Sequence, residues 1–139
     1  MAAKPLGDDF AYLGEVDDVP ALLAGLTVAL VPSVAEETFG LGAAEAMAVG
    51  TPTVVTPQGA LPEVVGSAGM VAEACTSEAV ADAVAAVLAD EALRERMGQE
   101  GRERARTLYS WAVQADLILG LLEEVMFDAR GNARCGAGP

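Results

Sequence analysis

Two glutamates on either side of a glycine-bearing turn are the residues of this chain whose types and spacing could do chemistry. Residues 28–56 read VALVPSVAEETFGLGAAEAMAVGTPTVVT, with Glu37 in an expected loop and Glu45 in the helix that should follow. Side chains on a helix lean toward its amino end, so Glu45 points back toward the loop that carries Glu37. We therefore expect both carboxylates to border one pocket and to accept hydrogen bonds from sugar hydroxyls.

The backbone at the start of the same helix suits a phosphate. The amides of Phe39, Gly40, Leu41 and Gly42 should be unpaired at the positive end of the helix, and the two glycines let a ligand approach the backbone closely. Residues 5–93 contain no Lys or Arg. A phosphate bound here must therefore rely on backbone amides or on charges supplied from elsewhere.

Blander interpretations of the same residues stay open at this point. Glu36 and Glu37 could simply compensate a helix dipole, an effect worth roughly 0.3–1 kcal/mol, with Glu45 as a solvated surface residue. Gly40 and Gly42 match only part of a dinucleotide-binding fingerprint, because Glu45 replaces its third glycine. A glycosidase-like pair of carboxylates would need one protonated acid across a substrate.

Composition excludes several classes of partner. The net charge of −13 argues against a nucleic-acid or anionic membrane surface, so we expect no nucleic acid partner and membrane association only through absent regions. The chain has no histidine, which removes the commonest general base and metal ligand. Cys75 and Cys135 lie far apart in the sequence and form no metal-binding spacing, so we expect no metal and a reduced, cytoplasmic setting.

Short apolar runs alternate with helical patterns along the first half of the chain. Strands are expected at residues 10–14, 27–31, 53–56 and 69–72, and helices at residues 17–26, 41–49, 61–65, 77–89, 91–108 and 111–127. This order predicts an α/β fold with a mainly parallel sheet, whose ligands bind beyond the carboxyl ends of the strands. So few strands make about half of a doubly wound sheet, with one edge left to pair.

Domain boundaries follow from the same pattern. With 139 residues and 53% hydrophobic content, the chain can bury the core of one domain or of part of one. We expect residues 1–9 to be an N-terminal extension, residues 10–127 to form the domain, and residues 128–139 to be a disordered tail.

The string PSVAEETFGLGAAEAMAVGTPTVVT resembles the signature of the group 1 retaining glycosyltransferases of GT-B fold. Their donor-binding domain carries a Pro-Ser strand end, two glutamates separated by seven residues around Phe-Gly-Leu, and then Glu-Ala-Met-Ala-x-Gly-x-Pro-Val-Val. The resemblance covers roughly residues 10–125. It implies a partial Rossmann-like, doubly wound domain with C-terminal helices. Thr38, Gly42 and Val49 depart from the family pattern.

The resemblance assigns roles to the site residues. It implies that Glu37 contacts donor-sugar hydroxyls at the reacting face and that Glu45 binds the ribose of the nucleotide. Phe39, Gly40 and Leu41 would touch the sugar and diphosphate. A nucleotide sugar is implied as substrate, with no cofactor or metal.

The resemblance also implies that parts of the enzyme are missing from this chain. These are an N-terminal acceptor domain and the first half of the donor domain, which supplies an Arg and a Lys for the donor phosphates. The chain is accordingly expected to be a C-terminal fragment, inactive alone. The alternative is a non-catalytic nucleotide-sugar-binding or interaction domain that pairs with a separate polypeptide.

Overall fold

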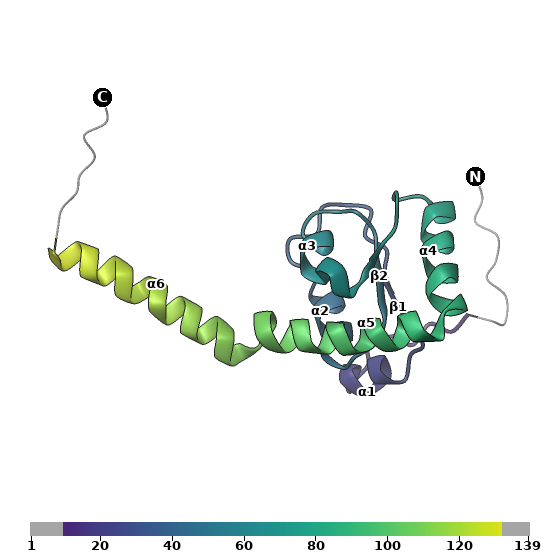
Figure 1. The fold of residues 1–139 in the computed structure, drawn as a ribbon, viewed down its shortest axis with the longest axis horizontal. Helices are drawn as coiled ribbons and strands as arrows, with labels where there is room; N and C mark the ends of the chain where they lie inside the picture. The colour runs from purple at the N-terminus through teal and green to yellow at the C-terminus, as the bar shows by residue number, and fades with distance from the viewer. Residues whose placement is uncertain (1–9, 132–139) are drawn as a thin grey trace, which may run out of the picture.

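A three-stranded parallel sheet lies at the centre of the computed structural model, which describes residues 10–131 (Figure 1). Its strands are β1 (Ala29–Val31), β2 (Thr53–Val55) and β3 (Met70–Val71), in the order β1-β2-β3. Leu30 lies opposite Val54, and Val54 lies opposite Met70. The α/β class and the parallel arrangement predicted from the alternating pattern are confirmed.

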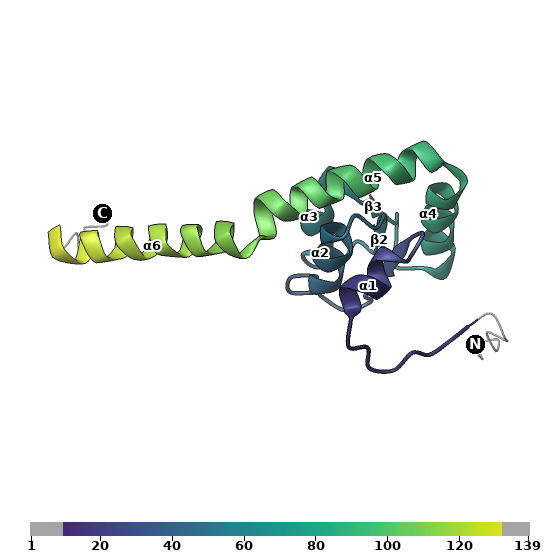
Figure 2. The ribbon, with the colours of Figure 1, turned by 90° about the horizontal axis from the view of Figure 1, so that it is seen from below.

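Helices cover both faces of this sheet (Figures 1 and 2). The described helical elements are α1 (Val19–Ala24), α2 (Leu41–Ala48), α3 (Leu61–Val65), the 3-10 turn η2 (Gly66–Ala68), α4 (Ser77–Ala89), α5 (Glu91–Arg104), the π-helical turn η3 (Ala105–Tyr109) and α6 (Trp111–Gly131). Of these, α6 extends away from the sheet (Figure 1).

Two hydrophobic clusters hold the layers together. Val55 faces α2 and α3, where it packs with Met47, Leu61 and Val65. Its neighbour Val54 faces the opposite side of the sheet and packs with Val87 of α4 and Met97 of α5. Successive side chains of a strand point to opposite faces, so the fully buried β2 supplies both clusters.

Strand β1 differs from the expectation that residues 27–31 are covered on both faces. Only Ala29 of this strand is buried, and Leu30 is 42% exposed. β1 lies at the edge of the sheet, so one side of it has no neighbouring strand within residues 10–131. The predicted sheet edge is thus present.

The strand predicted at residues 10–14 was wrong. These residues form no strand in the structure, and Tyr12 is 88% exposed. A strand needs hydrogen bonds from a neighbour, and residues 10–131 offer it none. The sheet therefore has three strands and not four.

Local signals at helix ends did predict the helices well. Thr76 caps α4 by accepting a hydrogen bond from Ala79 N at 3.2 Å, directly before the helix expected from residue 77. Ser110 accepts one from Val113 N at 3.4 Å. α6 continues beyond the expected end at residue 127 to Gly131, whereas residues 1–9 and 132–139 lie outside the described residues. Within the described part, no helix is both long and apolar enough to cross a membrane.

Helix α5 crosses α2 at very close range. Gly98 is buried, and a Cβ placed on it would lie 2.6 Å from the carbonyl oxygen of Gly50. One turn further on, a Cβ at Gly101 would lie 3.5 Å from Met47. The absence of side chains at these two positions lets the two helices approach each other.

The loop that follows β1 is anchored by the end of β2. The buried Thr56 hydroxyl donates to Ser33 O at 2.6 Å, and Ala60 N donates to Glu37 O at 2.9 Å. Gly59 has a φ of +52° and lies directly against the backbone of Glu37, where a Cβ would come within 2.2 Å of the carbonyl oxygen. The loop carrying Glu37 is therefore fixed through its backbone.

We expect Gly98→Ala to destabilise the fold even though alanine favours a helix interior over glycine by about 1 kcal/mol. The added methyl group would meet the Gly50 carbonyl and push the helices apart, a type of overpacking that costs about 1–3 kcal/mol. Urea denaturation followed by circular dichroism measures the difference. Gly120→Ala on α6, which has open space around it, is the control and should not destabilise the chain.

A second pair of glycines separates backbone conformation from packing. Gly59→Ala and Gly14→Ala both place alanine at a positive φ, which costs about 1–2 kcal/mol. Only Gly59 has backbone atoms in the way, since nothing lies within 4 Å of a Cβ at Gly14. Gly59→Ala should therefore lower the free energy of unfolding more than Gly14→Ala does. Equal losses would show that the contact with Glu37 is not tight.

Candidate functional site

Glu37 lies in the anchored loop at the carboxyl end of β1, where the parallel sheet predicts a ligand site. Its half-buried carboxylate accepts two long hydrogen bonds, from Ser33 Oγ at 3.4 Å and from Gly40 N at 3.3 Å. Bonds of this length are weak. The carboxylate is thus placed by its backbone and remains able to exchange these partners for a ligand.

The amino end of α2 carries no side-chain cap. Gly40 occupies the N-cap position with a φ of +83°, in the left-handed region that glycine adopts without strain. A Cβ on Gly40 would meet the side chain of Leu61 at 2.6 Å, so the turn also needs glycine for space. The structure therefore builds this helix start around a bare peptide backbone.

One of the amides expected to be free is in fact used. Gly40 N donates to the Glu37 carboxylate, whereas no hydrogen bond within residues 10–131 uses the amides of Phe39, Leu41 and Gly42. Unpaired amides at a helix start favour a negatively charged group. Three of the four amides of this turn are therefore without a partner among the described residues, and phosphate binding by them stays a prediction.

Glu45 lies on the exposed face of α2, one turn into the helix. It lines a cavity of about 450 Å³ together with Phe39 and Leu41. Glu37, Gly40 and Gly42 do not line this cavity. The structure thus divides the six predicted residues into two groups, a loop group around Glu37 and a helix-face group around Glu45.

The far wall of the cavity comes from residues that sequence reasoning missed. Arg102, Arg106, Tyr109 and Ser110 from α5, η3 and the residue after them all line it. The rings of Tyr109 and Phe39 meet edge to face with centroids 5.6 Å apart, so the two sides of the cavity are in contact at this point.

Cations therefore do reach the α2 face from within this chain. Residues 5–93 contain no Lys or Arg, but Arg102 and Arg106 line the same cavity as Glu45. Gly40 and Gly42 do not line it, so the expectation that a phosphate at the helix start relies on backbone amides or on charges from elsewhere stays a prediction. These arginines are four residues apart and so share one face of the helical segment. That spacing was the only sign in the sequence that the two arginines act together. It did not indicate which other element their face of the helix would pack against.

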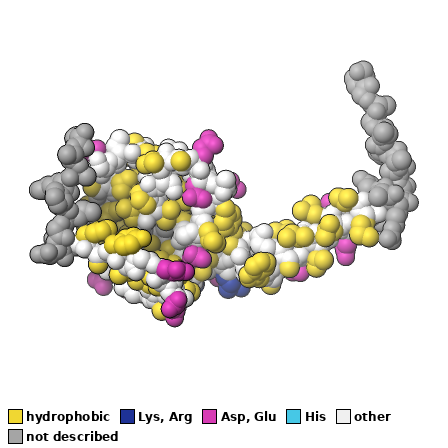
Figure 3. All heavy atoms as spheres, turned by 180° about the vertical axis from the view of Figure 1, so that it is seen from behind, with side chains coloured by type: hydrophobic (Ala, Val, Ile, Leu, Met, Phe, Trp, Pro, Cys, Tyr) yellow, Lys and Arg dark blue, Asp and Glu magenta, His cyan; other side chains and the backbone are white. Residues whose placement is uncertain are grey.

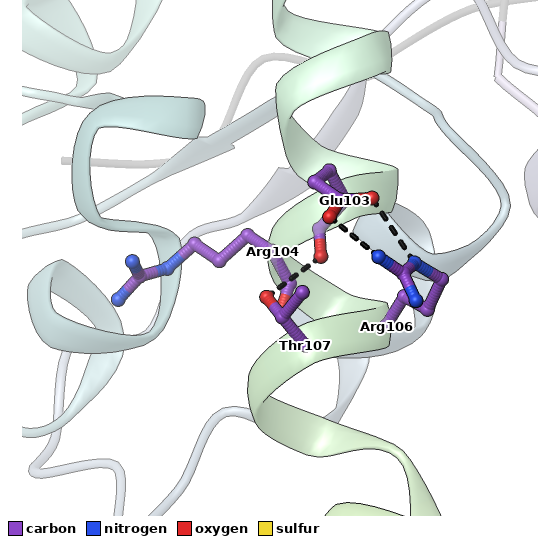
Figure 4. Close-up of polar contacts among 4 residues, drawn as sticks. All are labelled: Glu103, Arg104, Arg106 and Thr107. Carbon is purple, nitrogen blue, oxygen red and sulfur yellow. Dashed lines mark hydrogen bonds and ion pairs between the residues drawn. The ribbon is translucent and has the colours of Figure 1, made fainter.

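Both arginines already have partners. Arg102 donates to the carbonyl oxygen of Val49 at 2.9 Å. Arg106 forms a two-bond ion pair with Glu103, and its guanidinium lowers the pKa of the Glu103 carboxyl while its own pKa is raised (Figure 4). This pair is well exposed, and exposed pairs are weak and easily exchanged.

Other acidic groups do not add a metal site. Among the described residues, no three His, Cys, Asp or Glu side chains gather as metal ligands would. Glu63 lies in the first turn of α3, where an acidic side chain opposes the helix dipole.

Known proteins share both the sequence and the fold. The family model described as "Glycosyl transferases group 1" matches residues 1–104. A phosphatidyl-myo-inositol mannosyltransferase from Mycobacterium leprae is 37% identical over 88% of this chain and 34% of its own length. An MMP alpha-(1->4)-mannosyltransferase from Mycolicibacterium hassiacum is 42% identical over 79% of this chain and 27% of its own.

Solved structures agree with these relatives. Sucrose-phosphate synthase from Thermosynechococcus elongatus superposes with a TM-score of 0.79 at 35% identity, over 89% of this chain and 32% of that one. The C-terminal domain of a group 1 family glycosyl transferase from Francisella tularensis gives a TM-score of 0.62 at 28% identity, over 73% of this chain and 53% of that domain. The chain thus spans about a third of the full-length relatives. It belongs to the group 1 glycosyltransferase family and has the fold of the GT-B enzymes.

Proposed function

We propose that this chain forms the carboxyl-terminal part of the donor-binding domain of a glycosyltransferase that uses a nucleotide sugar. The observation that carries this proposal is the uncapped start of α2 at the carboxyl end of β1, with Glu37 on one side of it and Glu45 on the other. Free amides suit the diphosphate, and the two carboxylates suit the hydroxyls of the sugar and the ribose.

In the proposed reaction the sugar moves to an acceptor hydroxyl with its anomeric configuration retained. The bond between the anomeric carbon and the donor phosphate oxygen breaks, the acceptor oxygen bonds that carbon, and the nucleoside diphosphate leaves with the proton that the acceptor hydroxyl gives up. Negative charge grows on that diphosphate in the transition state, where aligned amides stabilise it most. Glu37 would hold the transferred sugar, and Glu45 the ribose.

The remainder of the enzyme would supply what this chain lacks. Because the chain spans about a third of its relatives, we place the acceptor-binding domain and the first half of the donor domain in the other part. That part would also contribute the Arg and Lys that bind the donor phosphates. The isolated chain should then bind donors only weakly, at about millimolar concentration or above, and should not catalyse transfer.

Binding by the isolated chain can be measured by titrating it with nucleotide sugars and recording backbone amide signals by nuclear magnetic resonance. We expect the signals of residues 39–42 to shift. Glu45→Ala should abolish the preference of the chain for binding a ribonucleotide over its 2′-deoxy analogue. Glu37→Ala should abolish its preference for binding the nucleotide sugar over the nucleoside diphosphate without the sugar. Glu63→Ala removes the same charge from the neighbouring α3 and is the control. Shifts that avoid residues 39–42, or sub-micromolar binding, would contradict the proposal.

Transfer needs a complete enzyme, in which this chain replaces the matching third of the Mycobacterium leprae mannosyltransferase. There we expect Glu37→Ala and Glu45→Ala each to lower kcat/KM at least about tenfold, since a hydrogen bond to a charged group contributes about 1.5–3 kcal/mol. Glu63→Ala should leave it unchanged, and the product should keep the donor's anomeric configuration. Unchanged kinetics in both site variants would overturn the site assignment, and an inverted product would overturn retention.

A further inference from the structure

Three arginines of α5 donate hydrogen bonds to the carboxyl ends of three other helices. Arg94 donates to Val87 O and Leu88 O at the end of α4, and Arg102 donates to Val49 O just after α2. Arg104 donates from Nε to Val64 O at 2.8 Å and from Nη2 to Glu63 O at 2.7 Å, in α3. The last carbonyls of a helix lack partners within it and carry partial negative charge, so each contact satisfies them and opposes the helix dipole.

These helices have no cation of their own for this purpose. The last turns of α2, α3 and α4 contain no basic residue. Residues 5–93 contain no Lys or Arg, so the cations at the ends of α2 and α3 come from α5. Other donors also act there, since Gly50 N and Thr51 N bind carbonyls of α2, and the Tyr109 hydroxyl shares Val64 O with Arg104.

The chain also leaves room for two of these side chains. Gly50 follows α2 with a φ of +81°, and a Cβ there would lie 2.2 Å from Arg102 Nη2. Gly66 follows α3 with a φ of +52°, and a Cβ there would lie 2.7 Å from Arg104 Cζ. Figure 4 shows the Arg104 side chain extending to the side opposite the Glu103–Arg106 pair, toward another helix. Each guanidinium group thus occupies the space that a side chain would take if Gly50 or Gly66 were replaced by a larger residue.

The opposite ends of the same two helices form the candidate site. α2 begins at the Gly40 turn, where Ala43 N and Ala44 N both donate to Gly40 O. α3 begins beside Ala60, whose amide holds the Glu37 carbonyl. α2 has eight residues and α3 has five, so a shift at one end is felt at the other.

We propose that Arg102 and Arg104 are positioning residues, which hold α2 and α3 by their carboxyl ends so that their amino ends keep the Glu37 loop and the Gly40 turn in place. The importance of this for catalysis rests on the donor site proposed above, but the positioning itself does not. Arg94 holds α4 on the other face of the sheet and has no part in positioning the Glu37 loop or the Gly40 turn.

The test is hydrogen exchange of backbone amides in the full chain, with no donor present. Arg104→Gln should speed exchange at Ala60, and Arg102→Gln should speed it at Ala43 and Ala44, each about fivefold, as expected for loss of an ordinary hydrogen bond. Two variants serve as controls. Arg94→Gln removes the same kind of hydrogen bond from the end of α4, and Arg96→Gln removes the same charge from an exposed position on α5. Neither control should change the exchange rate at Ala43, Ala44 or Ala60.

Conservative variants test the geometry. Arg102 makes one hydrogen bond, which a lysine ammonium can replace, so Arg102→Lys should restore slow exchange. Arg104 spans two carbonyls with a planar fork, so Arg104→Lys should restore it only in part. If Arg94→Gln accelerates exchange at Ala60 as much as Arg104→Gln does, the effect is general loss of stability and the proposal is wrong. It is also wrong if Arg102→Lys matches Arg102→Gln.

A donor titration of the same variants separates this proposal from the proposed function. If Arg104→Gln speeds exchange at Ala60 and weakens the donor-induced shifts at residues 39–42, both proposals are supported. If exchange responds as expected while the unmodified chain shows no donor-induced shift, the positioning stands and the proposed donor site fails.

Discussion

The close crossing of α5 over α2 is the constraint on which the rest of this structure depends. Gly98 lets the α5 backbone come against the Gly50 carbonyl, at a distance that leaves no room for a larger side chain. Because α5 lies there, its arginines reach the ends of three other helices, and the turn after it closes a cavity over Glu45. Within residues 10–131 the sheet has three short strands, and both hydrophobic clusters are completed from this part of the chain, one by Met97 of α5 and the other by Ala105 of the turn after it.

Charge is distributed in the chain in a way that the total of −13 conceals. Acidic residues are spread along the whole chain, α5 included, whereas α5 and the turn after it carry five of the eight Lys and Arg residues. In the fold, Arg102 and Arg104 donate to neutral carbonyl groups of other helices, while Arg106 pairs with an acid on the surface. The net charge describes how the molecule interacts at a distance, and it says little about the field next to Glu45.

Features set by neighbouring residues could be predicted from the sequence, and features set by distant contacts could not. Thr76 before α4 and Gly50 after α2 mark helix ends through their own backbone chemistry, so these boundaries were expected. The Gly40 turn was found in the same way. Residues 10–14 have the apolar pattern of a strand, but a strand exists only with a partner. Which residues line the cavity with Glu45, Arg106 among them, depends on how α5 and the turn after it pack. The π-helical turn at Ala105–Tyr109 left no mark in the sequence pattern, which predicted plain helix to residue 108.

Helix α6 has a thermodynamic consequence. It extends from the η3 turn with apolar side chains along much of its length, and Leu117, Leu121 and Val125 are each more than half exposed (Figure 3). Isolated helices in water are only marginally stable, because ordering the chain costs nearly as much free energy as the backbone bonds return. The sheet and its covering helices share buried side chains and should melt together in one sharp transition. α6 shares almost none of them, so in the free chain its helicity should decline gradually on warming, as a sloping baseline beneath the melting curve of the domain.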